Sequence, residues 1–184
     1  EIFSGNSNMK LCYGKADWDM CCNSIHIIDL ALWLFCDKIK HIENFNLDNI
    51  IYESKRHGFV ELTGILTGEL ENGGIFKLES VKSETQKKVE FEIISDTRKL
   101  NVSEDEEKAV LCRKENKWIP EEYKFHIPFQ SEKTQKIVKK ILETGQCNLT
   151  TLDESIEMHK PLLLGFIDHL NKISDTKYTY CPIT

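Results

Sequence analysis

The stretch Cys21-Cys22-Asn23-Ser24-Ile25-His26-Ile27-Ile28-Asp29-Leu30-Ala31-Leu32-Trp33-Leu34-Phe35 puts one histidine at the mouth of an otherwise almost wholly apolar segment. Its apolar residues recur at helical spacing and would cover nearly the whole circumference of a helix. We therefore expect a helix that is buried on most sides. Asn23 or Ser24 can cap the start of this helix through a side-chain oxygen. His26 and Asp29 share one face of it at spacing i, i+3.

Length and charge exclude several classes of protein. A chain of 184 residues fits one domain. The net charge of −6, with acidic and basic residues interleaved, offers no basic face, so nucleic acid is not an expected partner. The longest apolar run, residues 25–36, is shorter than the roughly 20 residues that cross a bilayer, and no membrane partner is expected. The first ten residues do not have the pattern of a signal peptide.

Seven cysteines form an odd set without a CxxC motif, which favours reduced thiols and a cytoplasmic location. Cys21, Cys22 and His26 lack the paired spacing of a structural zinc site, so we predict no metal site. Cys22 precedes His26 by four residues, which is the spacing at which a helical thiol can meet an imidazole. A small buried thiol is the alternative reading of Cys22.

The rest of the chain predicts a sheet followed by helices. Alternating or apolar runs indicate strands at residues 9–14, 39–51, 59–70, 75–82, 88–95, 99–102, 109–114 and 123–127. In the run 59–70, Val60, Leu62, Leu66 and Leu70 fall on one face, while Glu61, Thr63, Thr67 and Glu69 fall on the other. This alternation is typical of a sheet that is covered on one side only.

Two helices are expected near the end of the chain. The first is predicted over residues 131–142, with Ile137, Val138, Ile141 and Leu142 pointing inward and Gly145 after its end. The second begins at the capping box Thr151-Leu152-Asp153-Glu154, and Pro161 should kink it or divide it. The order helix, sheet, helix implies an α+β fold, with an open-faced, largely antiparallel (mixed) sheet and helices packed on one face.

The chain resembles the C-terminal domain of the glucose-fructose oxidoreductase and inositol dehydrogenase (Gfo/Idh/MocA) superfamily over nearly its whole length. The segments that carry the resemblance are His26-Ile27-Ile28-Asp29-Leu30 with Trp33-Leu34-Phe35, Lys55-Arg56-His57-Gly58-Phe59, Asn72-Gly73-Gly74, and Leu149-Thr150-Thr151-Leu152-Asp153-Glu154-Ser155 followed by His159.

The resemblance implies a single domain over residues 1–184 that binds substrate and mediates oligomerisation, with the family's N-terminal nucleotide-binding domain absent from this chain. No glycine-rich nucleotide loop and no Glu-Lys-Pro motif occur in the sequence. The cofactor implied for the full-length protein is therefore NAD or NADP, with none held by this chain alone. The implied role is the substrate-binding half of an NAD(P)-dependent sugar or nucleotide-sugar oxidoreductase in surface polysaccharide biosynthesis.

Family members often carry the pattern D-x-x-x-H, whose histidine takes the hydroxyl proton as hydride leaves the same carbon. The resemblance places that histidine at His26, because an imidazole accepts and returns a proton near neutral pH. The aspartate position is occupied by Cys22, with Asn23 beside it, so this chain departs from the pattern there. A helix-capping or core histidine is the alternative reading of His26.

Four further residues are candidate substrate contacts, each with a structural alternative. Asn23 can bond a sugar hydroxyl or cap the helix. Trp18 and Asp19 can border a sugar pocket or pack the turn before the helix. Arg56, within the basic cluster 55–57, can meet a substrate phosphate or belong to a solvated turn.

Three functions therefore stay open at this point: half of a sugar dehydrogenase, a non-catalytic binding or dimerisation module with a vestigial pocket, and a cysteine-dependent enzyme. The open sheet face predicts a homodimer or homotetramer, because exposed apolar patches seldom stay in contact with solvent. Ile65 and Val81 are the residues expected first in that interface.

Overall fold

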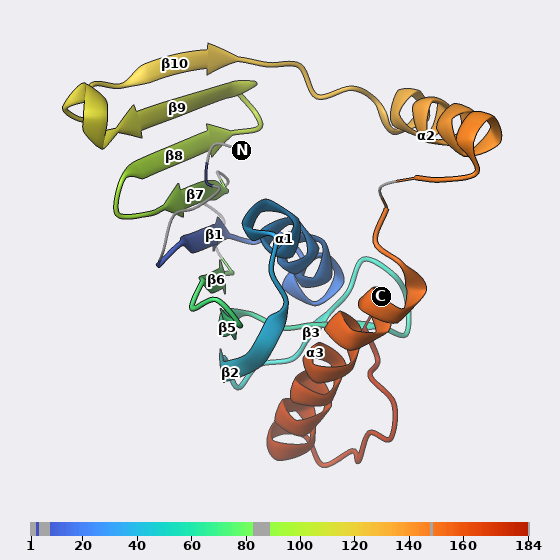
Figure 1. The fold of residues 1–184 in the computed structure, drawn as a ribbon. Coiled ribbons are helices and arrows are strands. Elements are labelled where there is room, and N and C mark those ends of the chain that lie inside the picture. Colours follow the sequence, from blue (N-terminus) through green and yellow to red (C-terminus); the bar gives the residue numbers. More distant parts are fainter. Residues whose placement is uncertain (1–2, 4–7, 83–88, 148, 184) are drawn as a thin grey trace.

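A single eight-stranded sheet organises the chain in a computed structural model, which describes residues 3, 8–82, 89–147 and 149–183. The strand order is β10-β9-β8-β7-β1-β6-β5-β2, and a short ribbon of β3 and β4 lies beside the sheet. Helices α1 and α3 lie on one side of the sheet (Figure 1). The α+β class with an open-faced sheet is therefore confirmed.

The strands and helices follow the predicted order. Their bounds are β1 Lys10–Ala16, α1 Met20–Phe35, β2 Ile39–Leu47, β3 Tyr52–Glu53, β4 Val60–Glu61, β5 Gly64–Leu70, β6 Ile75–Ser80, β7 Glu90–Ile94, β8 Arg98–Ser103, β9 Lys108–Arg113, a 3-10 turn Lys114–Asn116, β10 Glu121–Lys124, α2 Gln130–Thr144 and α3 Leu152–Ile173. The predicted start of one strand, Lys88, lies outside the described residues.

β1 sits in the middle of the sheet, where it pairs in parallel with β6 and antiparallel with β7. The other neighbouring pairs of the sheet are antiparallel. Gly14 of β1 has a φ of +126°, and a Cβ at this position would lie 1.7 Å from the carbonyl oxygen of Glu79. Only glycine fits here, because β1 and β6 approach each other closely at this residue.

The core lies between the sheet and the two helices. Ile28 and Ala31 of α1 are fully buried, as are Leu66 of β5 and Phe76 of β6. Phe166 of α3 meets Phe45 of β2 edge to face, with ring centroids 5.6 Å apart. Gly165 makes that approach possible, since a Cβ there would lie 1.9 Å from the Phe45 ring. α3 thus closes the β2 side of the core, and α1 closes its centre.

The capping box of α3 is confirmed. The Thr151 hydroxyl accepts from the backbone N–H of Glu154, and the Glu154 carboxylate accepts from the backbone N–H of Thr151. Pro161 lies inside α3 without dividing it, so the division does not occur and the predicted kink stays a prediction. A proline removes one intrahelical hydrogen bond, and the burial of Met158, Leu162 and Phe166 on either side of it holds the helix in one piece.

α2 forms at the predicted place, but its apolar stripe does not point inward. None of its 15 residues is buried, and Leu142 is 82% exposed. The helix stands apart from the sheet and from α1 (Figure 1). The prediction of an inward stripe is therefore wrong, because helical periodicity shows that a face is apolar without showing what covers that face.

The predicted strand 59–70 is interrupted. β4 ends at Glu61, β5 begins at Gly64, and Gly64 has a φ of +122° that turns the chain between them. Glu61 and Thr63, which alternation assigns to the open face, are therefore buried. Within β5 the alternation holds, with Leu66 and Leu70 buried and Thr67 and Glu69 half-buried on the opposite face.

The open face of the sheet is rich in cross-strand ion pairs. Lys99 pairs with Glu92 across β8 and β7, and Lys108 pairs with Glu122 across β9 and β10, each at 2.7 Å. Ile65 is half-buried among such residues, opposite Glu79 of β6. Within the described residues, no helix has both the length and the apolar character needed to cross a bilayer.

Candidate functional site

A tight backbone turn precedes the N-terminus of α1, which we call its mouth. The residue before the helix supplies no side-chain cap. α1 begins at Met20, and Asp19 before it adopts a left-handed conformation and makes no side-chain capping bond. The predicted start at Asn23 or Ser24 is therefore wrong by one helical turn. Ser24 instead bonds its hydroxyl back to the carbonyl oxygen of Met20, a use that serine has inside helices.

A side chain from a strand distant in sequence supplies the cap at the N-terminus of α1. Glu61 of β4 accepts hydrogen bonds from the backbone N–H groups of Cys21, at 2.9 Å, and Cys22, at 3.3 Å. The first N–H groups of a helix have no partner within the helix, and a carboxylate also complements the positive end of the helix. Burial raises the pKa of the Glu61 carboxyl, and the bonds from Cys21 and Cys22 oppose that rise.

Asn23 and Trp18 hold the turn in front of α1. The Asn23 side-chain amide donates to the Trp18 carbonyl oxygen at 2.8 Å. The Trp18 indole N–H donates to the Glu79 carbonyl oxygen, also at 2.8 Å, and the Trp18 side chain is only 7% exposed. Both residues thus lie at the N-terminal end of α1, and both make hydrogen bonds that hold the fold there. Their role as substrate contacts stays a prediction.

Charged side chains surround this mouth in two ion pairs. Asp19 binds Lys55 at 2.5 Å, and Asp17 binds Lys82, whose ammonium group also lies 5.2 Å from the centroid of the Tyr52 ring. The hydrogen bond that Lys55 donates to the Asp19 carboxylate raises the pKa of Lys55, so the ammonium form persists. The Lys55 pair joins the basic turn 54–58 to the start of α1.

Arg56 and His57 follow Lys55 in that turn, and both are exposed. Within the described residues, the Arg56 guanidinium makes no hydrogen bond or ion pair. Arg56 is therefore a free cation one residue away from the contact that reaches the mouth of α1. This placement suits a role in binding an anionic group, and the role itself stays a prediction.

His26 lies on the outer side of α1, one helical turn beyond Cys22. Its side chain is exposed, and it makes no hydrogen bond or ion pair to another described residue. Trp33, two turns further along the same side, is 69% exposed. A histidine that satisfied the core would be buried and bonded. The exposure of His26 therefore excludes a core role, and its acid-base role stays a prediction.

The two cysteines before His26 differ in environment. Cys21 is buried, and burial raises the pKa of its thiol. A raised thiol pKa opposes the thiolate form that nucleophilic and metal-binding cysteines use. Cys22 is half-buried beside it. Asp29, which shares a face with His26, accepts a hydrogen bond from the Thr150 hydroxyl at 2.7 Å and so ties α1 to the segment before α3.

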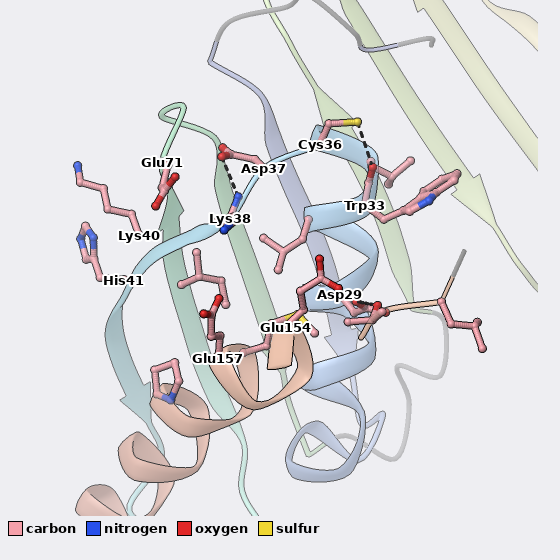
Figure 2. Close-up of a pocket in the computed structure, with 17 residues that line it drawn as sticks. Asp29, Trp33, Cys36, Asp37, Lys38, Lys40, His41, Glu71, Glu154 and Glu157 are labelled. Atoms are coloured by element: carbon pink, nitrogen blue, oxygen red, sulfur yellow. Dashed lines mark hydrogen bonds between the residues drawn. The ribbon is translucent and has the colours of Figure 1, made fainter. Parts of the chain in front are cut away.

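A hollow of about 940 Å³ lies at the opposite end of α1 (Figure 2). It is bounded by the second half of α1, the start of β2 and the first turns of α3, and none of the five predicted site residues lines it. Two carboxylates that line it already accept backbone hydrogen bonds. Asp37 accepts from the N–H groups of Lys38 and Asn72, and Glu154 belongs to the capping box. We therefore place the candidate site at the mouth of α1.

Sequence reasoning missed Glu61, Lys82 and Tyr52 at this mouth. The only available signal for Glu61 was an acidic residue next to a glycine-broken strand, which does not reveal a contact across about 40 positions of the chain. Arg56 and Lys55 were found because basic residues cluster in the sequence. Residues that meet only through tertiary packing leave no such local pattern.

Comparison with known proteins places the fold. No family model and no curated protein matches the sequence. Among solved structures, a UDP-N-acetylglucosamine 3-dehydrogenase from Acidithiobacillus ferrooxidans superposes with a TM-score of 0.62 at 10% identity, over 87% of this chain and 52% of that one. A levoglucosan dehydrogenase in complex with NADH superposes with a TM-score of 0.56 at 11% identity, over 94% and 58%.

A third similar structure is a super-repressor mutant of Gal80p from Saccharomyces cerevisiae, with a TM-score of 0.56 at 14% identity, over 88% of this chain and 55% of that one. The chain thus spans about half the length of each of these structures. At identities this low, the superpositions show a shared fold and nothing finer. The fold that the sequence resemblance predicts is confirmed.

Proposed function

We propose that this chain, which has the fold of the C-terminal domain of Gfo/Idh/MocA oxidoreductases, is the substrate-binding and oligomerisation half of an NAD(P)-dependent sugar or nucleotide-sugar oxidoreductase. The observation that carries the proposal is the imidazole of His26 in the second turn of α1, which is exposed and has no partner among the described residues. A role in surface polysaccharide biosynthesis and a cytoplasmic location belong to the same proposal.

His26 would act as the acid-base residue. Oxidation of a sugar hydroxyl releases a proton, and a neutral imidazole near the carbinol can accept it. Arg56, whose guanidinium has no partner among the described residues, suits the phosphate of a nucleotide-sugar. Trp18, Asp19 and Asn23 would form the wall between these two residues.

A nicotinamide cofactor would supply the hydride acceptor. Within the described residues no glycine-rich turn leads from a strand into a helix, so this chain does not fit the pyrophosphate of a dinucleotide by itself. The cofactor would therefore have to be bound by protein outside this chain.

The test is the activity of the complete protein encoded by the gene. We expect its upstream coding sequence to contain a strand followed by G-x-G-x-x-G and, later, Glu-Lys-Pro. The complete protein should then reduce NAD or NADP with UDP-N-acetylglucosamine or a related nucleotide-sugar, followed by the absorbance of the reduced nicotinamide. A complete protein without a nucleotide-binding domain would contradict the proposal.

A non-catalytic binding module is the second candidate. Cys22 stands where the family pattern has aspartate, and a protein described as a super-repressor shares the fold. A complete protein that binds NAD(P) or a nucleotide-sugar in calorimetry, but produces no reduced nicotinamide with any sugar tested, would favour this candidate.

The open sheet face would join two or four copies of the chain. Charged residues on this face pair with each other within one chain. The half-buried Ile65 and Val81 would therefore supply the apolar contact with another copy. We expect Ile65→Lys to convert the oligomer into monomers in light scattering, because the change buries an unpaired charge at the interface. Ile50→Lys, at a residue 53% exposed outside the sheet, is the control. A wild-type monomer at micromolar concentration would contradict this part of the proposal.

A further inference from the structure

Glu61 connects two elements that meet at the candidate site. It pairs with Tyr52 in the β3–β4 ribbon, and the loop of that ribbon is the turn that carries Lys55 and Arg56. The backbone N–H of Val60 also donates to the Pro182 carbonyl oxygen at 2.8 Å, which anchors the ribbon to the end of the described chain. Glu61 is therefore held by the fold on its own side of the contact with α1.

The contact with α1 is bidentate. Oε2 of Glu61 accepts from the N–H of Cys21, and Oε1 accepts from the N–H of Cys22. Both oxygens of the side chain act as acceptors, although Glu61 is only 8% exposed. Such a carboxylate is costly to bury unless both oxygens are bonded, so its place in the core depends on these two N–H groups.

The bonded N–H groups belong to the helical turn that leads directly into His26. In an α-helix the N–H of residue i bonds the carbonyl oxygen of residue i−4, so the His26 amide bonds the carbonyl oxygen of Cys22. Without a cap, the first turn of a helix frays. The position of the imidazole therefore depends on whether the peptide groups of Cys21 and Cys22 stay in place.

We propose that Glu61 is the positioning residue of His26, an inference that rests on the proposed function. Its two carboxylate oxygens fix the first turn of α1 against the ribbon that carries Arg56. One carboxylate thus sets the geometry between the acid-base residue and the cation that would bind the substrate phosphate. Asp19 and Lys55 add a second contact between the same ribbon and the same helix.

Variants of Glu61 in the complete protein test this role. Glu61→Ala removes both acceptors, whereas Glu61→Gln keeps the shape with one acceptor and turns an NH2 group toward an N–H. We expect kcat to fall by about tenfold or more in Glu61→Ala, and by a smaller factor in Glu61→Gln, since small displacements of a catalytic group cost large factors in rate. The KM for the nicotinamide cofactor should change by less than about twofold, because Glu61 is not expected to contribute to cofactor binding.

The control is Glu143→Gln, which removes a carboxylate of α2 whose partner is Lys139, away from the sheet and from α1. It should leave kcat unchanged. A merely structural role for Glu61 would lower the melting temperature of its variants and leave the kcat of the folded protein at the wild-type value. That result in Glu61→Gln, which preserves the side-chain volume, would overturn the proposal.

Amide hydrogen exchange separates this inference from the proposed function. In the complete protein, Glu61→Ala should raise the exchange rates of the Cys21, Cys22 and His26 amides by about tenfold or more, with α3 unchanged, because local opening of the first turn becomes easier. This readout needs no activity, so an inactive wild-type protein would contradict the proposed function alone. Unchanged exchange at these amides would overturn the positioning role.

Discussion

Replacing His26 by alanine is expected to lower kcat with the sugar substrate by about 100-fold or more, because a positioned general base contributes factors of this size. The imidazole is exposed and bonded to no other described side chain, so its removal creates no cavity and leaves no partner unsatisfied. The melting temperature should stay close to the wild-type value. Steady-state kinetics of the complete protein, together with thermal unfolding of the same preparation, measure both quantities.

The matched control is His126→Ala. His126 is also exposed and pairs with Glu107 at 2.9 Å. It lies beyond β10, an edge strand of the sheet, whereas α1 follows the central strand β1. Both variants remove an exposed imidazole, and only the one at His26 should lose activity. A loss of less than about threefold in kcat for His26→Ala would refute its acid-base role.

Replacing Gly14 by alanine is expected to destabilise the fold by more than about 4 kcal/mol, which is a large part of the stability of an ordinary domain. Two effects add at this position. The new Cβ would lie 1.7 Å from the Glu79 carbonyl oxygen, and the φ of +126° is unfavourable for any residue with a side chain. Since the obstacle is backbone of β6, the clash is relieved only by separating two central strands. Denaturant unfolding of the purified chain should show the loss, or soluble protein should not be obtained.

Gly73→Ala separates these two effects. Gly73 has a φ of +81°, but a Cβ at this position meets nothing within 4 Å. Only the backbone strain remains, which costs about 1–2 kcal/mol. Equal destabilisation by the two substitutions would show that the close approach of β1 and β6 has no energetic weight.

Local patterns predicted the elements of this fold well. The helix through His26, the strands and the capping box at Thr151 depend on neighbours within a few residues, and such signals can be seen in a single sequence. The basic cluster around Arg56 was visible for the same reason. The start of α1 was misplaced by one turn, because its cap comes from Glu61 and not from the preceding residues.

The remaining errors concern what each face meets. Glu61 alternates with apolar residues and therefore reads as solvent-facing, but the turn at Gly64 sends it into the core. The apolar stripe of α2 is typical of a face that packs on a core, yet the stripe, which includes Leu142, is not buried. Both outcomes depend on the positions of distant segments, which periodicity does not encode.

The central place of β1 also constrains the growing polypeptide during synthesis. Its partners begin at Ile75 and Glu90, so both edges of β1 emerge from the ribosome about 60 residues before either neighbour exists. Unpaired strand edges attract foreign strands. β1 carries Lys10 and Lys15 among its apolar residues, and these charges face solvent. They are the kind of residue that keeps an unpaired edge from joining another nascent chain.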